Sequence, residues 1–114
     1  MDSTSSDTLK KSVLTKGFRE EVELLSRHIR MLQFVQKHGP VGIIRLGQLL
    51  GTPKHKVRYS LRILEKEGYI RPSTQGAMAT DKVAVFFDSV QGLLGDVQKE
   101  IEGLKDILRK GPQA

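Results

Sequence analysis

Apolar residues recur at helical spacing along residues 17–37. The apolar positions step by four and three residues and are Phe18, Val22, Leu25, Ile29 and Leu32. Such steps place all five side chains on one stripe of a helix. Gly39-Pro40 ends this helix because proline disfavours helical geometry in the residue before it. We expect the early part of the stripe to form a seam with another helix and the late part to contact the core.

Two further helices with a tight turn between them are predicted next. Residues 41–43 are expected to be extended and residues 44–50 to form a short helix, which Gly51 ends. Thr52 is the expected N-cap of the following helix, since threonine satisfies free backbone N–H groups. Pro53 then stands at the first helical position, where its fixed φ is favourable.

That next helix is expected to reach about Glu67, with Gly68 at the C′ position that glycine favours. Its apolar side chains follow the i, i+4, i+7 rule of one helix face and are Val57, Leu61 and Leu64. Residues 69–73 and 77–79 are short extended pieces. Gly76 between them can adopt the positive φ of a hairpin turn. The pattern therefore predicts a small hairpin after the helix.

A long final helix is expected from a cap at Thr80 or Asp81 to about Arg109, with an apolar seam that repeats for about three and a half heptads. It would be about 43 Å long at a rise of about 1.5 Å per residue. We expect a homodimer, because a small domain is too short to cover this stripe. An ordinary amphipathic helix packed on its own domain is the alternative. The predicted dimer interface consists of Phe18, Val22, Leu25, Val83, Phe87, Val90, Leu94, Val97, Ile101, Leu104 and Leu108.

Charge is concentrated in the middle of the chain. The whole sequence of 114 residues has a net charge of +6. Residues 37–71 contain eight basic and two acidic residues, a net charge of +6, whereas the parts before and after carry +1 and −1. A local positive field of this kind favours a polyanionic partner.

The order of two helices, a turn between them and a hairpin is that of a winged helix-turn-helix, whose second helix lies in the DNA major groove. We therefore predict a mainly α fold, with this core and long terminal helices forming a dimer. Cationic and polar side chains lie on the outward side of the second helix and on the wing. The predicted DNA-binding residues are Lys54, His55, Lys56, Arg58, Tyr59, Arg62, Arg71, Ser73, Thr74 and Gln75.

Roles can be suggested for some of these side chains. Lys54 and Arg58 lie one turn apart near the helix start and are expected to contact base edges or phosphates. Arg58 could make the bidentate contact to guanine that arginine commonly makes. Lys56 and Arg62 are expected to hold phosphates. His55 and Tyr59 have alternatives, a solvated ring and half-burial against the hairpin, and the wing is expected to play a minor part.

Two stretches carry a family resemblance. They are HKVRYSLRILEKEGYI (55–70) and PSTQGAMAT (72–80). The segment resembles the winged helix-turn-helix core of small predicted transcriptional regulators found in archaea. The match covers roughly residues 30–80. The resemblance implies double-stranded DNA binding and gene regulation, without a target gene or an effector.

Other functions are less well supported by the residues. We expect no enzyme and no cofactor, because the three histidines lie on separate elements and no triad-like or metal-ligand spacing occurs. A winged-helix adaptor that binds protein or RNA in a transcription or translation complex stays open, as does a small apolar effector near Phe86 and Phe87. With no cysteine and no apolar run of membrane-spanning length, we expect a cytoplasmic protein with no membrane partner. The expected division is a disordered tail at 1–7, the DNA-binding domain at 8–80 and the dimerisation helix at 81–114.

Overall fold

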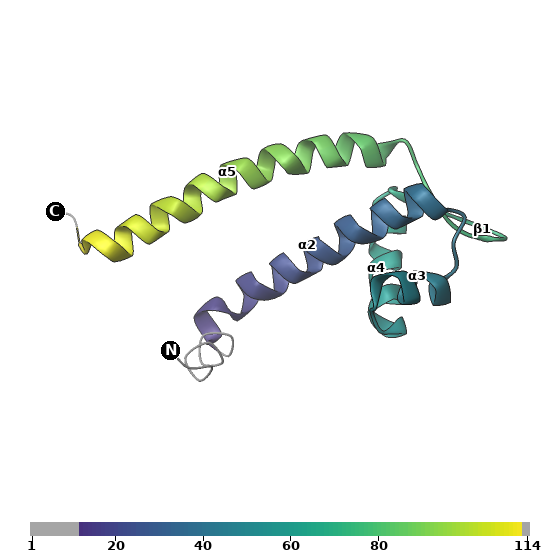
Figure 1. Cartoon of the computed structure of the whole chain (residues 1–114), viewed down its shortest axis with the longest axis horizontal. Coiled ribbons are helices and arrows are strands. Elements are labelled where there is room, and N and C mark those ends of the chain that lie inside the picture. The colour runs from purple at the N-terminus through teal and green to yellow at the C-terminus, as the bar shows by residue number, and fades with distance from the viewer. Residues whose placement is uncertain (1–11, 113–114) are drawn as a thin grey trace. The chain divides into compact units, whose positions relative to one another are not determined.

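The computed structural model describes residues 12–112, so the tail predicted at residues 1–7 lies outside the described residues. The described chain is mainly helical and contains a two-stranded antiparallel sheet (Figure 1). Two compact units, residues 1–80 and 81–114, are described in turn. The elements are α2 (Val13–His38), α3 (Ile43–Leu50), α4 (Lys54–Lys66), β1 (Ile70–Ser73), β2 (Gly76–Ala79) and α5 (Lys82–Lys110).

Helix α2 differs between its two halves. Met31, Leu32 and Val35 near its end are buried, so this part contributes to the core of the first unit. Near its start, Phe18 and Val22 are 60% and 50% exposed. The late part of the apolar stripe thus packs in the core as predicted, while the early part is exposed to solvent.

The turn between α3 and α4 depends on Gly51, which adopts a left-handed conformation with φ 60° and ψ 37°. Residues other than glycine rarely adopt this backbone conformation. Helix α3 begins at Ile43, so the extended stretch predicted at residues 41–43 is shorter than expected.

The prediction that Thr52 caps α4 is wrong. Pro53 occupies the N-cap position with extended angles, φ −59° and ψ 147°, and α4 begins one residue later. Pro53 is therefore not the first helical residue either. The Thr52 hydroxyl instead donates to the Leu50 carbonyl at 3.3 Å, so it serves the preceding turn rather than the free N–H groups of α4.

The end of α4 confirms the predicted glycine stop. Gly68 has φ 84° and follows the C-cap residue Glu67. Its N–H donates to the Glu65 carbonyl at 3.1 Å, and the Tyr69 N–H donates to the Leu64 carbonyl at 2.9 Å. This is the Schellman arrangement, which satisfies the last carbonyls of a helix and turns the chain into β1.

The hairpin pairs Ile70 with Ala79 at its base. A further bridge joins Ala77 to Val41, with N–H···O distances of 3.0 and 2.8 Å in the two directions. Gly76 permits this approach, because a Cβ at this residue would lie 2.5 Å from the Val41 carbonyl carbon. The bridge fixes the hairpin to the segment that leads into α3.

The core of the first unit forms where α2 packs against α3, α4 and β2, and where α4 also packs against α3 and β1. This arrangement is compatible with a helix-rich, winged-helix-like fold. Its buried hydrophobic residues are Met31, Leu32, Val35, Val41, Leu46, Leu50, Val57, Leu64, Ile70 and Ala77.

The second unit is α5, a helix of 29 residues. Asp81 stands at its N-cap position but makes no side-chain cap hydrogen bond, and the Thr80 hydroxyl donates to the Gly68 carbonyl at 2.7 Å, so the predicted cap does not form. Val83 and Val90 of the predicted seam are buried. Within the described residues, no helix is long and apolar enough to cross a membrane.

Candidate nucleic-acid interface

The inward side of α4 is made by Val57, Ser60 and Leu64, which are 0%, 0% and 4% exposed. Leu61, predicted to share this side, is half-buried. The inward side is therefore rotated by part of a turn from the prediction, and it includes a polar residue that the apolar pattern does not reveal.

Every predicted DNA-binding residue of α4 is exposed: Lys54, His55, Lys56, Arg58, Tyr59 and Arg62. At about 100° per residue, His55, Tyr59 and Arg62 lie near the middle of the outward side, opposite Val57. Tyr59 is 54% exposed. The first turn of α4 contains no acidic residue.

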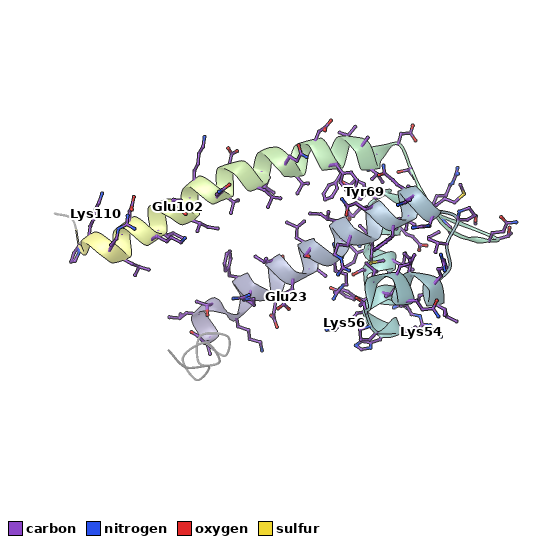
Figure 2. All side chains as sticks on the ribbon, viewed as in Figure 1. Glu23, Lys54, Lys56, Tyr69, Glu102 and Lys110 are labelled. Atoms are coloured by element: carbon purple, nitrogen blue, oxygen red, sulfur yellow. The ribbon has the colours of Figure 1, made fainter. Side chains whose placement is uncertain are left out.

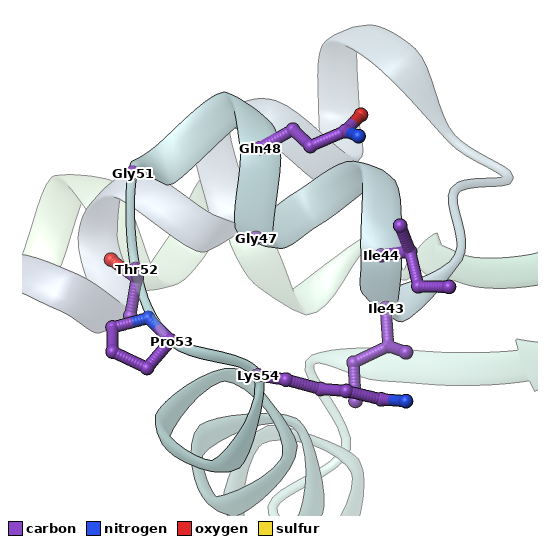
Figure 3. A pocket seen from close by; sticks show the side chains of 8 residues that line it. All are labelled: Ile43, Ile44, Gly47, Gln48, Gly51, Thr52, Pro53 and Lys54. Atoms are coloured by element: carbon purple, nitrogen blue, oxygen red, sulfur yellow. The ribbon is translucent and has the colours of Figure 1, made fainter.

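Lys54 and Lys56 lie on opposite flanks of α4, about 160° apart by the same helical geometry; both are labelled in Figure 2. Lys54 lines a hollow of about 430 Å³ between the start of α4 and α3. The other lining residues are Ile43, Ile44, Gly47, Gln48, Gly51, Thr52 and Pro53, and Figure 3 shows their side chains around it. The flank at Lys54 thus combines an amine with an apolar surface.

Lys56 faces a different environment. It lines a hollow with Glu20, Glu21 and Glu23 of α2, and with Arg27. Carboxylates beside an amine offset its charge, so Lys56 offers a weaker positive field to a polyanion than Arg58 or Arg62 does. The cations of α4 are therefore not equivalent, although the sequence pattern treats them alike.

The wing exposes Arg71, Ser73, Thr74 and Gln75. Two of these also hold the turn together, because the Ser73 hydroxyl donates to the Gly76 carbonyl at 2.7 Å and accepts from the Gln75 N–H at 3.2 Å. Arg71 is the cation of the hairpin. Its guanidinium approaches the Met78 sulfur at 3.9 Å.

A polar junction between α2 and α4 was not predicted from the sequence. The Arg27 Nε–H donates to the Ser60 Oγ at 2.9 Å, and the His28 Nε2 lies 3.0 Å from the same oxygen. Burial lowers the pKa of His28, the Arg27 charge lowers it further, and Glu21 acts in the opposite direction. The helical spacing of Ser60 from Val57 and Leu64, at i+3 and i−4, is the signal that could have placed it inside.

The Ser60–His28 contact has the distance of a nucleophile and its base, but the site does not suit catalysis. Ser60 is 0% exposed, so a substrate has no access to its oxygen. Arg27 already donates to that oxygen. Over residues 12–112, no group of three or more His, Asp or Glu side chains is placed to hold a metal ion.

The predicted dimer residues fall into three groups. Val83 and Val90 are buried, and Leu25, Phe87, Val97 and Ile101 are half-buried. The exposed members are Phe18, Val22, Leu94, Leu104 and Leu108. Phe86 and Phe87, near which an effector was considered, are half-buried with ring centroids 6.0 Å apart.

Comparisons with known proteins add no family to this description. No protein-family model matches the sequence, and no curated protein matches it.

Proposed function

We propose that the protein binds double-stranded DNA as a homodimeric transcriptional regulator of the winged helix-turn-helix class, with α4 in the major groove. One observation carries the proposal: α4 buries its inward side in the protein core, while Arg62 on the opposite side and Arg58 and Lys54 on one flank are exposed. The start of α4 also offers free backbone N–H groups and the positive end of the helix dipole, which favour a phosphate. No acidic side chain in the first turn offsets this positive end.

The geometry refines the roles of the cations. Arg58 and Arg62 lie on the exposed side of α4 and are assigned to base edges and phosphates. Lys54, beside the hollow at α3, is assigned to a phosphate at the groove edge. Lys56 is assigned a lesser role because three glutamates line the same hollow.

The dimer belongs to the same proposal. Leu104 and Leu108 of α5 and Phe18 of α2 are 60%, 84% and 60% exposed in the single chain. A second copy would bury such side chains and present a second α4. DNA half-sites for a two-fold protein of this class lie about 34–36 Å apart. The resemblance of residues 55–80 to archaeal regulators supports the same assignment.

Selection of bound duplexes from random DNA tests the proposal. We expect the wild type to enrich a roughly palindromic motif. Arg58→Ala should weaken binding to that motif by about tenfold or more, the effect of losing a good bidentate base contact. If the contact is to a phosphate, the substitution should also reduce the slope of the logarithm of affinity against the logarithm of salt concentration by about one.

Lys99→Ala is the matched control, because it removes the same charge from an exposed position on α5. Its affinity and motif should stay close to those of the wild type. Equal losses in both variants would indicate general charge attraction rather than a specific surface. Absence of duplex binding, together with capture of single-stranded RNA, would overturn the proposal in favour of an adaptor that binds RNA.

A further inference from the structure

Helix α4 is held against α2 by a polar junction at its centre. Ser60 is 0% exposed, and its Oγ lies 2.9 Å from the Arg27 Nε and 3.0 Å from the His28 Nε2. Both partners come from α2. No buried side-chain nitrogen or oxygen in the described part of the chain lacks a hydrogen-bond partner. The junction is thus a satisfied polar contact inside an otherwise apolar interface, the kind of contact that fixes one packing arrangement.

The protonation state of His28 decides how this junction is hydrogen bonded. A serine hydroxyl has one hydrogen to donate and two lone pairs to accept with. Arg27 can only donate, and its Nε–H occupies one lone pair of Ser60. In the neutral tautomer with its proton on Nδ1, the His28 Nε2 accepts from the Ser60 hydroxyl, and all three side chains are matched.

Protonation of His28 reverses the second bond. The Nε2–H must then donate to Ser60, and the serine hydrogen has to leave for another acceptor. The imidazolium also lies next to the fixed positive charge of Arg27, in a half-buried place. Acid therefore replaces a matched junction with one in which two positively charged side chains donate to the same Ser60 oxygen and the serine hydrogen has lost its acceptor, which weakens the contact of α4 with α2 at this point.

We propose that the Arg27–Ser60–His28 junction positions α4 for DNA, so that DNA binding weakens when His28 gains a proton. The inference rests on the proposed DNA-binding function and names a way to regulate it. Ser60 is a positioning residue, since it lies on the inward side and touches no DNA. A change in its pairing alters the rotation of α4, and with it the aim of Arg58 and Arg62.

The charges around the junction support this direction of the effect. Burial lowers the pKa of His28, the Arg27 guanidinium lowers it further, and Glu21 raises it less. From α4, Lys56 lines the same hollow as Arg27 and Glu21. The other elements packed on α2 are α3, whose charged residue is Arg45, and β2, which contains no charged residue. The fold thus favours neutral His28.

The sign of the pH dependence follows from the lowered pKa. The stabilisation from neutral His28 is complete above the ordinary value of 6.5. It decreases as the pH falls below that value toward the lowered pKa of the folded protein, because the unfolded chain binds the proton more readily. DNA affinity should decrease as the pH falls below the lowered pKa of His28 in the free folded protein.

The test measures duplex affinity from about pH 7.5 to about pH 5.5 in two variants, with about a tenfold change expected where the coupling equals one pKa unit. Both carry His55→Gln, which removes the exposed imidazole of α4 so that His28 is the histidine that differs between the two variants. One of them also carries His28→Gln, whose amide can still hydrogen bond to Ser60. The single variant should lose affinity in acid, and the double variant should keep a nearly constant affinity. Circular dichroism at each pH confirms that both remain folded.

The outcomes separate the two proposals. If the wild-type protein binds no duplex at any pH, the proposed function fails. If both bind with the same pH profile, the junction proposal fails and the DNA-binding function stands.

A measurement on the wild type covers the case in which His28→Gln does not fold. By thermodynamic reciprocity, DNA should lower the pKa of His28 as neutral His28 favours DNA. Nuclear magnetic resonance titration with and without duplex measures this directly. A His28 pKa that is unchanged or raised by the duplex would overturn the proposal.

Discussion

Helices α4 and α5 are both amphipathic by sequence, but the apolar side of α4 is buried, whereas the apolar side of α5 becomes exposed toward its end. Val57 and Leu64 of α4 are 0% and 4% exposed, in contacts with α2, α3 and β1. Toward the end of α5, Leu104 and Leu108 are 60% and 84% exposed. The same spacing of apolar residues therefore yields a helix in both places, whereas the apolar side chains near the end of α5 are left exposed.

The uncovered side of α5 has an energetic consequence. Fully burying a leucine side chain stabilises a protein by about 1.5–3 kcal/mol relative to leaving it exposed. In a two-fold dimer each burial occurs twice. The glycines of α5 oppose an isolated helix, since each costs up to about 1 kcal/mol relative to alanine. A partner helix would bury the exposed leucines and so gain their burial energy, and this gain would offset the cost of the glycines.

The largest effect should come from placing charge on this uncovered side. Leu104→Lys combined with Leu108→Lys should convert the proposed dimer to a monomer at micromolar concentration, because four lysines would meet in the seam. DNA affinity should fall by about two orders of magnitude or more, since avidity from two linked sites is lost. Sedimentation velocity and duplex titration measure the two effects.

Asp96→Lys is the matched control for that double variant, because it changes the net charge by the same amount at an exposed position beside the seam. It should remain dimeric. If the wild-type protein sediments as a monomer, the apolar side chains at the end of α5 are exposed in solution as well. The dimer proposal would then be wrong.

A smaller effect is expected on the covered side of α4. Leu64→Ala should lower the free energy of unfolding by about 2–5 kcal/mol, because it removes buried methyl groups and leaves a cavity. Arg62→Ala, on the exposed side of the same helix, should change it by no more than about 0.5 kcal/mol. Denaturant titrations at one fixed protein concentration measure both, and similar values for the two would contradict the assigned inward side.

The sequence predicted the parts of the fold that depend on local geometry. Gly68 ends α4 at positive φ, and the hairpin turns at Gly76, because few other residues adopt those conformations. It failed at Thr52, where two local hydrogen bonds compete: the hydroxyl donates to the Leu50 carbonyl two residues earlier instead of capping α4.

The candidate site depends on both local and tertiary information. Exposure of the α4 cations follows from helical spacing once one apolar side is known. The different charge surroundings of Lys54 and Lys56 do not follow from helical spacing. They depend on Glu20, Glu21 and Glu23, more than thirty residues earlier in the chain. Ser60 was missed for the same reason, since its polar partners Arg27 and His28 lie on another helix.

The smallest expected effect separates the seam from the charged surface of α5. Lys105 Nζ lies 3.4 Å from Glu102 Oε2, and both side chains are more than half exposed. Pairs of this kind contribute about 0.3–0.5 kcal/mol on a helix surface, and salt screens them. Lys105→Ala should therefore shift the unfolding free energy by no more than about 0.5 kcal/mol, whereas Leu104→Ala, one residue away, should lower it further and make it more dependent on protein concentration. If Lys105→Ala were the more damaging of the two in thermal unfolding at matched concentrations, α5 would be stabilised along its own surface and would need no second helix.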